Sequence, residues 1–112
     1  MRNKTWIHRH IDDPFVKRAS REGWRSRAVF KLQEFDEKYN LLQTGMTVID
    51  LGAAPGGWSQ YAAKKIGGKG KIIAVDVLSM DAITNVSFLQ GDFTEPEIYG
   101  SILTLAGHNK VD

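Results

Sequence analysis

The chain has 112 residues, of which 42% are hydrophobic and 25% are charged, a composition typical of one ordinary globular domain. It contains no cysteine, which excludes a disulfide framework, a thiolate nucleophile and a cysteine-ligated zinc site. No apolar run reaches the roughly 18 to 20 residues that span a bilayer, and the N-terminus lacks the apolar stretch of a signal peptide, so we expect a cytoplasmic protein without a membrane partner.

The net charge of +2 is unevenly distributed along the chain. Residues 1–31 contain nine lysines and arginines against three acids, a net charge of +6, whereas residues 32–112 contain six against ten, a net charge of −4. Clustered basic side chains gain affinity for phosphates by releasing condensed counterions, so the N-terminal segment is predicted to face a polyanion such as nucleic acid. A solvated basic helical face and a membrane-surface helix have similar compositions and are the alternatives.

Two helices are predicted after a loose basic arm of about ten residues. The first covers residues 14–22, because Asp13 can cap its N-terminus, Pro14 suits the first helical position and Gly23 supplies a left-handed stop. The second runs from about Ala28 to Tyr39, with Ser26 as a candidate cap. Its apolar stripe is predicted to consist of Val29, Leu32, Phe35 and Tyr39, with Lys31 on the flank of the stripe beside Phe35.

From Gly45 the pattern changes to short apolar runs separated by glycines. It predicts strands over residues 46–51, 71–76 and 86–90 and helices over residues 58–66 and 95–105. Strands alternating with helices favour βαβ units and therefore an α/β fold with a parallel sheet. Another strand is predicted to start at residues 110–112, so we expect an incomplete domain. The chain divides into a basic segment, residues 1–44, and the parallel-strand half of a ligand-binding domain, residues 45–112.

The strongest local signal is the run Asp-Leu-Gly-Ala-Ala-Pro-Gly-Gly-Trp, residues 50–58, at a junction of strand and helix. Glycines there let a ligand approach the backbone, and the helix N-terminus beyond offers free amide groups. The run is not a Walker loop, because no Gly-Lys-Ser/Thr follows it. It also lacks the dinucleotide fingerprint, since Ala54 stands at the position of the second glycine and Pro55 intervenes. A ligand loop is favoured over a turn required only for packing.

Three acids follow the three predicted strands. Asp50 and Asp76 end the first and second strands, and Asp92 follows the third. The carboxyl ends of parallel strands border the ligand crevice of an open α/β sheet, so these acids are predicted to lie along one edge. A carboxylate after the second strand suits ribose hydroxyls, which points to a nucleoside-containing cofactor. Each acid could instead cap a helix or a turn, and Asp92 ahead of Thr94 fits that role.

Several separated motifs in this sequence resemble the FtsJ/RrmJ-type ribose 2′-O-methyltransferases. They are Arg25 to Leu32 (Arg-Ser-Arg-Ala-Val-Phe-Lys-Leu), Asp50 to Gln60, Ile66 to Gly70 and Phe88 to Phe93, in the family's order. The resemblance covers the chain from about Trp6 onward. It implies a Rossmann-like class I methyltransferase fold and methylation of a ribose 2′-hydroxyl, that of a uridine, in large-subunit ribosomal RNA.

The resemblance also implies S-adenosyl-L-methionine as the cofactor. Gly56 and Trp58 would lie at its methionine part, Asp76 near its ribose and Asp92 near its adenine. The cofactor-binding residues predicted in this way are Asp50, Gly52, Ala53, Pro55, Gly56, Gly57, Trp58, Asp76 and Asp92. Lys31 matches the first lysine of the family's catalytic Lys-Asp-Lys-Glu set, and the other three members belong to later segments that this sequence does not contain. We therefore expect the 112-residue chain to be inactive alone.

The basic segment is assigned to RNA binding. Its candidate residues are Arg2, Lys4, Arg9, Lys17, Arg18, Arg21, Arg25 and Arg27, with Trp6 and Trp24 as possible stacking surfaces. Packing of Trp24 and ion pairing of Arg25 and Arg27 are the structural alternatives. His8 and His10 lack an acidic partner, so no metal is assigned. We expect a monomer. A transfer RNA or mRNA-cap methyltransferase and a non-catalytic RNA-binding or cofactor-sensing module are the alternative functions.

Overall fold

The computed structural model describes residues 13–107 and residue 111. Its elements follow in the order α2 (Pro14–Glu22), α3 (Val29–Tyr39), β1 (Thr47–Leu51), α4 (Gly57–Ile66), β2 (Lys71–Asp76), β3 (Val86–Gln90) and α5 (Pro96–Ala106). In this part of the chain the strands form a three-stranded parallel sheet in the order β1-β2-β3, with Val48 opposite Ile72 and Ile72 opposite Val86. The predicted α/β fold with a parallel sheet is confirmed.

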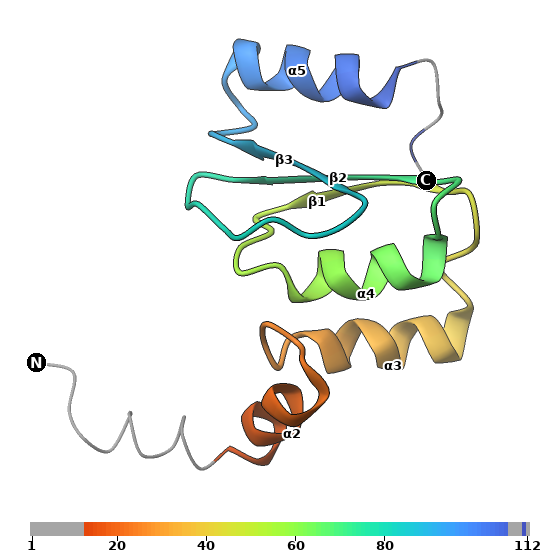
Figure 1. The fold of residues 1–112 in the computed structure, drawn as a ribbon. Helices are drawn as coiled ribbons and strands as arrows, with labels where there is room; N and C mark the ends of the chain where they lie inside the picture. The colour runs from red at the N-terminus through yellow and green to blue at the C-terminus, as the bar shows by residue number, and fades with distance from the viewer. Residues whose placement is uncertain (1–12, 108–110, 112) are drawn as a thin grey trace, which may run out of the picture.

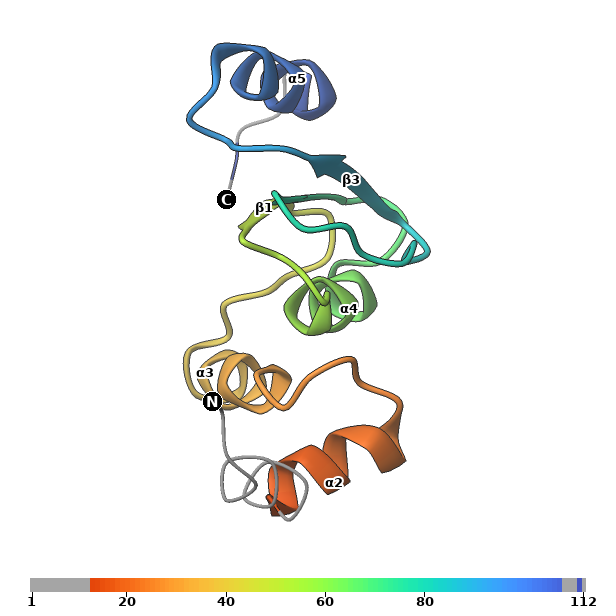
Figure 2. The same ribbon diagram turned by 90° about the vertical axis from the view of Figure 1, so that its left-hand side faces the viewer.

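The helices and the sheet are stacked in layers, which both ribbon views show (Figures 1 and 2). Helix α5 covers one face of the sheet and α4 covers the other, while α3 packs on α4 and α2 lies outermost. Successive side chains of β2 point to opposite faces of the sheet, so this strand packs against both α5 and α4. Ile73 and Val75 pack with Ile102 and Ala106 of α5, whereas Ile72 packs with the α4 side. A strand buried on both faces explains the continuous apolar run of residues 72–75.

The predicted element boundaries agree with the structure to within one residue. Strands β2 and β3 have the predicted bounds, β1 and α3 begin one residue later, α4 begins one residue earlier, and α5 is shifted by one residue. The first strand is less buried than predicted, because it forms an edge of the described sheet and Leu51 at its end is 48% exposed. Val111 lies outside any strand, and Lys110 and Asp112 are not among the described residues.

The caps of the two N-terminal helices are formed by local hydrogen bonds. The Asp13 carboxylate accepts from the amides of Phe15 and Val16, and Gly23 adopts the left-handed conformation (φ 82°), as predicted for α2. The predicted cap of α3 is wrong. Ala28 occupies the N-cap position, and the Ser26 hydroxyl instead accepts from the amide of Ala28 at 3.2 Å.

The buried face of α3 differs from the predicted apolar stripe. Val29 is buried, but Phe35 is 40% and Tyr39 is 58% exposed, and the other buried residue of the helix is Asp36. A stripe of apolar residues at helical spacing predicts that Phe35 and Tyr39 are buried, and it gives no reason to bury Asp36. In the structure the Asp36 carboxylate accepts from the Tyr61 hydroxyl of α4 at 2.8 Å, so the contact between α3 and α4 is polar at this point.

The Asp36 carboxylate is further held by the amide of Leu42 at 2.8 Å and by Lys65, whose Nζ lies 3.8 Å away. Burial alone would raise the pKa of Asp36, but the donors from Leu42 and Tyr61 and the charge of Lys65 lower it below its ordinary value. The same environment, burial first and then the bond to Asp36, raises the pKa of Tyr61 to about 12. This network fixes the N-terminal helices on the sheet domain.

Candidate functional site

The glycine loop lines a hollow at the carboxyl end of β1. The hollow has a volume of about 320 Å³ and is lined by Ser26, Ala28, Asp50, Leu51, Gly52, Ala53, Ala54, Pro55, Gly57 and Trp58. The N-termini of α3 and α4 and the carboxyl ends of the strands lie on the same side of the molecule (Figure 1). Parallel α/β sheets bind ligands at this edge. The structure therefore brings six of the predicted cofactor residues together around one hollow, namely Asp50, Gly52, Ala53, Pro55, Gly57 and Trp58.

A second hollow adjoins the first across Pro55. It has a volume of about 560 Å³ and is lined by Arg25, Pro55, Ser79, Met80 and Asp81. Its wall comes from the segment after β2, which the sequence analysis did not assign to the site. The two hollows together extend from the end of β1 to the segment that follows β2.

Asp76 links these two walls through its carboxylate. One oxygen accepts from the amide of Ala54 in the glycine loop at 2.9 Å, and the other accepts from the amide of Leu78 at 2.9 Å. These backbone donors lower the pKa of Asp76, which keeps the carboxylate ionised. Each carboxylate oxygen still has a lone pair for another donor. A fixed anion with free acceptor capacity is suited to hydroxyl groups of a ligand.

Asp50 is oriented by Ser59 in the third residue of α4. The Ser59 hydroxyl is buried and donates to the Asp50 carboxylate at 2.7 Å. Burial raises the pKa of Asp50, the bond from Ser59 partly opposes that shift, and the nearby charge of Asp76 adds to it. Asp50 was predicted from the sequence as a site residue, whereas Ser59 was not. A serine one turn into the helix after a glycine loop is the signal that could have identified it.

Asp92 takes the alternative role that the sequence left open for it. Its carboxylate accepts from the amide and the hydroxyl of Thr94, at 2.9 Å and 2.7 Å, and these bonds lower the pKa of Asp92. Asp92 thereby stabilises the turn that leads into α5. Like Asp76, Asp92 lines neither hollow at the glycine loop, and its predicted contact with the cofactor stays a prediction.

The glycines of the loop serve two different purposes. Gly52 has φ +74°, and a Cβ placed there would meet open space, so its backbone is accessible to a ligand. At Gly56 a Cβ would lie 2.8 Å from the Ile83 side chain, and at Gly57 it would lie 3.0 Å from the Ser26 hydroxyl. At Gly52 the space that the prediction requires for a ligand is open, whereas Gly56 and Gly57 make room for neighbouring protein segments.

Arg25 connects the N-terminal segment to both walls of the site. Its guanidinium donates to the carbonyls of Pro55 at 3.2 Å, Asp81 at 2.5 Å and Ala82 at 2.7 Å. The amide of Arg25 also donates to the side-chain oxygen of Gln60 in α4 at 2.8 Å. A guanidinium that is bonded to three carbonyls is committed to the fold. The prediction that Arg25 contacts RNA is therefore revised to a role in holding the glycine loop against residues 79–82.

Trp58 forms a second connection to the N-terminal segment. Its indole nitrogen donates to the carbonyl of Ala28 at 2.7 Å, while the side chain as a whole stays 42% exposed at the hollow. This bond places the start of α3 at the rim of the hollow. Lys31, the predicted catalytic residue, lies one turn further along α3, with its Nζ 5.1 Å from the centroid of the Phe35 ring. Lys31 does not line the glycine-loop hollow.

The remaining basic candidates lie on α2 and in the loop after it. Arg18 pairs with Glu22 at 2.6 Å, and Arg27 pairs with Asp13. Within the described residues neither Lys17 nor Lys31 forms an ion pair. Arg21 lies in the exposed last turn of α2. The predicted RNA-binding residues Arg2, Lys4 and Arg9, together with Trp6, His8 and His10, lie outside the described residues.

Trp24 adopts the packed arrangement that was one of its two interpretations. Its ring lies against Tyr61 with centroids 6.0 Å apart, its indole nitrogen donates to Glu22 at 3.2 Å, and Lys64 Nζ lies 4.6 Å from its ring centroid. These contacts attach the turn after α2 to helix α4. Trp24 is therefore engaged within the protein and presents little free surface for a base.

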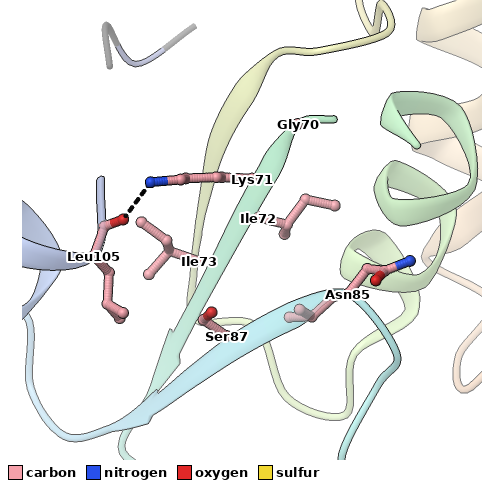
Figure 3. Close-up of a pocket in the computed structure, with 8 residues that line it drawn as sticks. Gly70, Lys71, Ile72, Ile73, Asn85, Ser87 and Leu105 are labelled. Carbon is pink, nitrogen blue, oxygen red and sulfur yellow. Dashed lines mark hydrogen bonds between the residues drawn. The ribbon is translucent and has the colours of Figure 1, made fainter. Parts of the chain in front are cut away.

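A further hollow of about 390 Å³ lies at the opposite end of the sheet. Figure 3 shows it between the amino ends of β2 and β3 and the last turn of α5, where Lys71 donates to the carbonyl of Leu105 at 3.3 Å. Its lining otherwise consists of aliphatic, serine, asparagine and glycine residues, so it offers neither an acid nor a free cation for chemistry. Ligands of parallel sheets bind at the carboxyl ends, and this hollow is therefore not the candidate site.

The part of the chain that the structure describes has neither a cluster of metal ligands nor a helix that could span a membrane. It contains no group of three or more histidine, cysteine, aspartate or glutamate side chains placed to hold a metal ion. None of its helices combines the length and the apolar character needed to cross a bilayer.

Comparison with known proteins supports the geometry. The model of the FtsJ-like methyltransferase family matches residues 24–112. The proteins named ribosomal RNA large subunit methyltransferase E from Pseudomonas fluorescens and Acinetobacter baylyi are 54% and 53% identical to this chain, over 99% and 98% of its length. The match covers 54% and 51% of those relatives, so the chain spans about half their length.

A solved structure is similar as well. A chain from Plasmodium falciparum, described as a ribosomal RNA methyltransferase, superposes with a TM-score of 0.69 and 33% sequence identity. The superposition covers 80% of this chain and 53% of the Plasmodium chain.

Proposed function

Because the chain belongs to the FtsJ-like methyltransferase family, we propose that it binds S-adenosyl-L-methionine and takes part in methylating a ribose 2′-hydroxyl, that of a uridine, in large-subunit ribosomal RNA. The observation that carries the proposal is the hollow at the carboxyl end of β1. The family's glycine loop forms its floor and the segment leading to Lys31 forms its rim. The names of the bacterial relatives favour ribosomal RNA over the transfer RNA and mRNA-cap substrates.

The residues of the hollow fit a nucleoside cofactor with a charged tail. Gly52 leaves its backbone open at the hollow. Asp76 lines neither hollow, but it accepts from the amide of Ala54 in the hollow's wall and presents an ionised carboxylate that is oriented by two amides. A carboxylate with one free lone pair on each oxygen can accept from two neighbouring ribose hydroxyls. When bound, the cofactor supplies an electrophilic methyl group, and the protein's contribution is orientation.

Lys31 is proposed to act on the RNA side of the reaction. Its ammonium group lies 5.1 Å from the Phe35 ring centroid, at the start of α3 beside the hollow. A charged lysine can donate a hydrogen bond to the ribose oxygen, hold it in line for attack and stabilise the charge that develops during proton loss. Lys31 is therefore proposed to orient the nucleophile, and a separate group or water would take the proton.

Two substitutions in the full-length gene product test whether Asp76 binds the cofactor and Lys31 acts on the RNA. Lys31→Ala is expected to leave cofactor affinity nearly unchanged and to abolish methyl transfer to large ribosomal subunits, because Lys31 lies outside the cofactor hollow. Asp76→Ala is expected to weaken cofactor affinity by about tenfold or more, since it removes the oriented carboxylate. Calorimetry with S-adenosyl-L-methionine and transfer of its radiolabelled methyl group measure the two effects.

Normal transfer by Lys31→Ala would return Lys31 to an ordinary surface lysine. Unchanged calorimetric affinity in Asp76→Ala would remove Asp76 from the cofactor site. Cofactor binding by the wild-type gene product without transfer to ribosomal RNA, transfer RNA or capped mRNA would instead support the non-catalytic, cofactor-sensing alternative.

A further inference from the structure

A separate hollow opens between α2 and the first turns of α3, beside Lys31. It has a volume of about 350 Å³ and is lined by Phe15, Arg27, Ala28, Phe30, Lys31 and Glu34. Ala28 lines this hollow and the glycine-loop hollow, and its carbonyl accepts from Trp58. The two hollows are therefore neighbours, separated by the backbone at the start of α3.

Two aromatic rings give this hollow a flat apolar surface. The rings of Phe15 and Phe30 are tilted by 47° with centroids 6.1 Å apart. The guanidinium of Arg18 already lies 4.1 Å from the Phe30 ring centroid, whereas Phe15 remains 51% exposed. Phe15 is therefore the ring with open surface. An exposed phenylalanine among basic side chains is a frequent feature of surfaces that bind a flat, anion-linked ligand.

Positive charge surrounds these rings. Lys31 forms no ion pair within the described residues, and Arg27 is paired only with Asp13 at the surface. Glu34 is the one acid in the lining of this hollow, so with Arg27 and Lys31 the lining carries two positive charges against one negative charge. Surface ion pairs are weak and are readily exchanged for phosphate. The hollow thus combines an apolar ring with cations placed to contact a phosphate backbone.

We propose that this hollow binds a nucleobase of the RNA strand, which stacks on Phe15 while Arg27 contacts a flanking phosphate. Stacking on an aromatic side chain next to basic residues is the way that proteins hold single-stranded RNA. Lys31 lines the same hollow, so the bound base would lie on the side of the chain that is proposed to face the reacting ribose. The proposal rests on the proposed function, because it assumes that Lys31 faces the RNA.

The experiment compares two single-stranded RNA probes with the full-length gene product. One is a fluorescein-labelled uridine decamer, and the other is a decamer of the same ribose-phosphate backbone without bases. Fluorescence anisotropy measures the affinity of each for wild type, Phe15→Leu and Phe15→Trp. Tyr99→Leu is the matched control, because Tyr99 is an equally exposed aromatic residue (58%) on α5, across the sheet from α2.

Wild type and Tyr99→Leu are expected to bind the uridine decamer more tightly than the abasic decamer. In Phe15→Leu the affinity for the uridine decamer should fall by about tenfold, the order of one lost base–aromatic stack, while affinity for the abasic decamer stays the same. Phe15→Trp keeps a stacking surface and should restore the preference for bases. Cofactor affinity should be unchanged in every variant.

Equal losses with both decamers in Phe15→Leu, or failure of Phe15→Trp to restore binding, would overturn the proposal, because they indicate damage to the fold and not a lost stack. Wild-type affinity in Phe15→Leu, or no preference of wild type for bases, would overturn it as well. The proposed function is judged separately by methyl transfer. Normal methyl transfer together with normal RNA binding in Phe15→Leu would contradict the proposed base-binding hollow without contradicting the proposed methyltransferase function.

Discussion

The two functional regions of this chain are organised in opposite ways. At the carboxyl edge of the sheet the acids are held by neighbouring donors, Asp76 by the amides of Ala54 and Leu78 and Asp50 by the Ser59 hydroxyl. On α2 and the start of α3 the cations are unpaired within the described residues, as Lys17 and Lys31 are, or joined in exposed ion pairs.

This difference suits two kinds of ligand. A small cofactor gains affinity from a site whose polar groups are already oriented, because little ordering remains to be done on binding. A long polyanion gains affinity from mobile cations that exchange weak surface partners for phosphates and release counterions. The contrast predicts that substitutions in the first region change cofactor affinity, and that substitutions in the second change RNA affinity and its dependence on salt.

The largest effect is expected where the two regions are joined. Asp36→Ala removes the buried acceptor of the Tyr61 hydroxyl and of the Leu42 amide. Leaving buried donors unpaired is expected to lower the free energy of unfolding by about 2 to 3 kcal/mol. Tyr61→Phe, which removes one donor and leaves the acid partly satisfied, should cost about 1 kcal/mol. Urea unfolding followed by circular dichroism measures both.

Glu37→Ala is the control, because Glu37 is an exposed acid on the same helix. The pKa of Asp36 is lowered, so its stabilising contribution is present above the unfolded value near 3.8 and is lost as the pH falls through the folded value. The difference between wild type and Asp36→Ala should therefore shrink in acid. A wild-type urea midpoint in Asp36→Ala would show that the helices are held on the sheet by other contacts.

Asp36 also shows where sequence reasoning stops. Secondary structure was predictable because local signals determine it. Asp13, Pro14 and Gly23 define both ends of α2, and the apolar run of residues 72–75 defines β2. The buried face of α3 was not, because a stripe at helical spacing marks Phe35 and Tyr39 as core and an acid as surface. The partner that buries Asp36 is Tyr61, 25 residues further along the chain.

The glycine loop gives the same lesson at the candidate site. Its position between a strand and a helix was predictable, and so was the edge on which Asp50 and Asp76 lie. The reasons for Gly56 and Gly57 were not, because the side chains that require them, Ile83 and Ser26, approach from distant parts of the chain. The bonds of Arg25 span 30 to 57 residues, so composition could only classify this residue as one more cation of a basic segment.

Arg25 tests the contrast between the two regions, because it belongs to the basic segment in sequence but bonds to both walls of the cofactor site. Arg25→Ala removes the bonds that hold Pro55 against Asp81 and Ala82, and cofactor affinity should fall by about tenfold, which is about 1.4 kcal/mol. Arg25→Lys should behave similarly, since one ammonium group cannot span three carbonyls as a planar guanidinium does. Calorimetry with S-adenosyl-L-methionine measures the change.

Arg21→Ala is the matched control for Arg25, because Arg21 is exposed in the last turn of α2. It should leave cofactor affinity unchanged and weaken RNA binding with a shallower dependence on salt. If Arg25→Ala instead kept cofactor affinity and reduced the salt dependence of RNA binding, Arg25 would be a phosphate contact. The assignment of Arg25 to the cofactor site, and not to the RNA-binding surface, would then be wrong.

The smallest expected effect is at Asp50, and its sign depends on pH. Burial raises the pKa of Asp50, so ionising it costs folding free energy as the pH rises from the unfolded value, near 3.8, through the raised folded value. Asp50→Asn avoids this cost and can still accept from the Ser59 hydroxyl. At pH 7 the variant should be as stable as wild type or slightly more stable, by less than about 1 kcal/mol, and wild type should gain on it as the pH falls to 4.

Urea unfolding at the two pH values, with Glu97→Gln as an exposed control, measures this difference. Asp50→Asn should also keep the loop in place, since the bond to Ser59 survives, so any loss of cofactor affinity would report the missing charge. If Asp50→Asn were less stable than wild type at pH 7 and recovered in acid, the stability difference would have the sign opposite to the one expected. It would mean that the ionised carboxylate stabilises the loop, and that Asp50 belongs with Asp76 among acids whose charge the backbone favours.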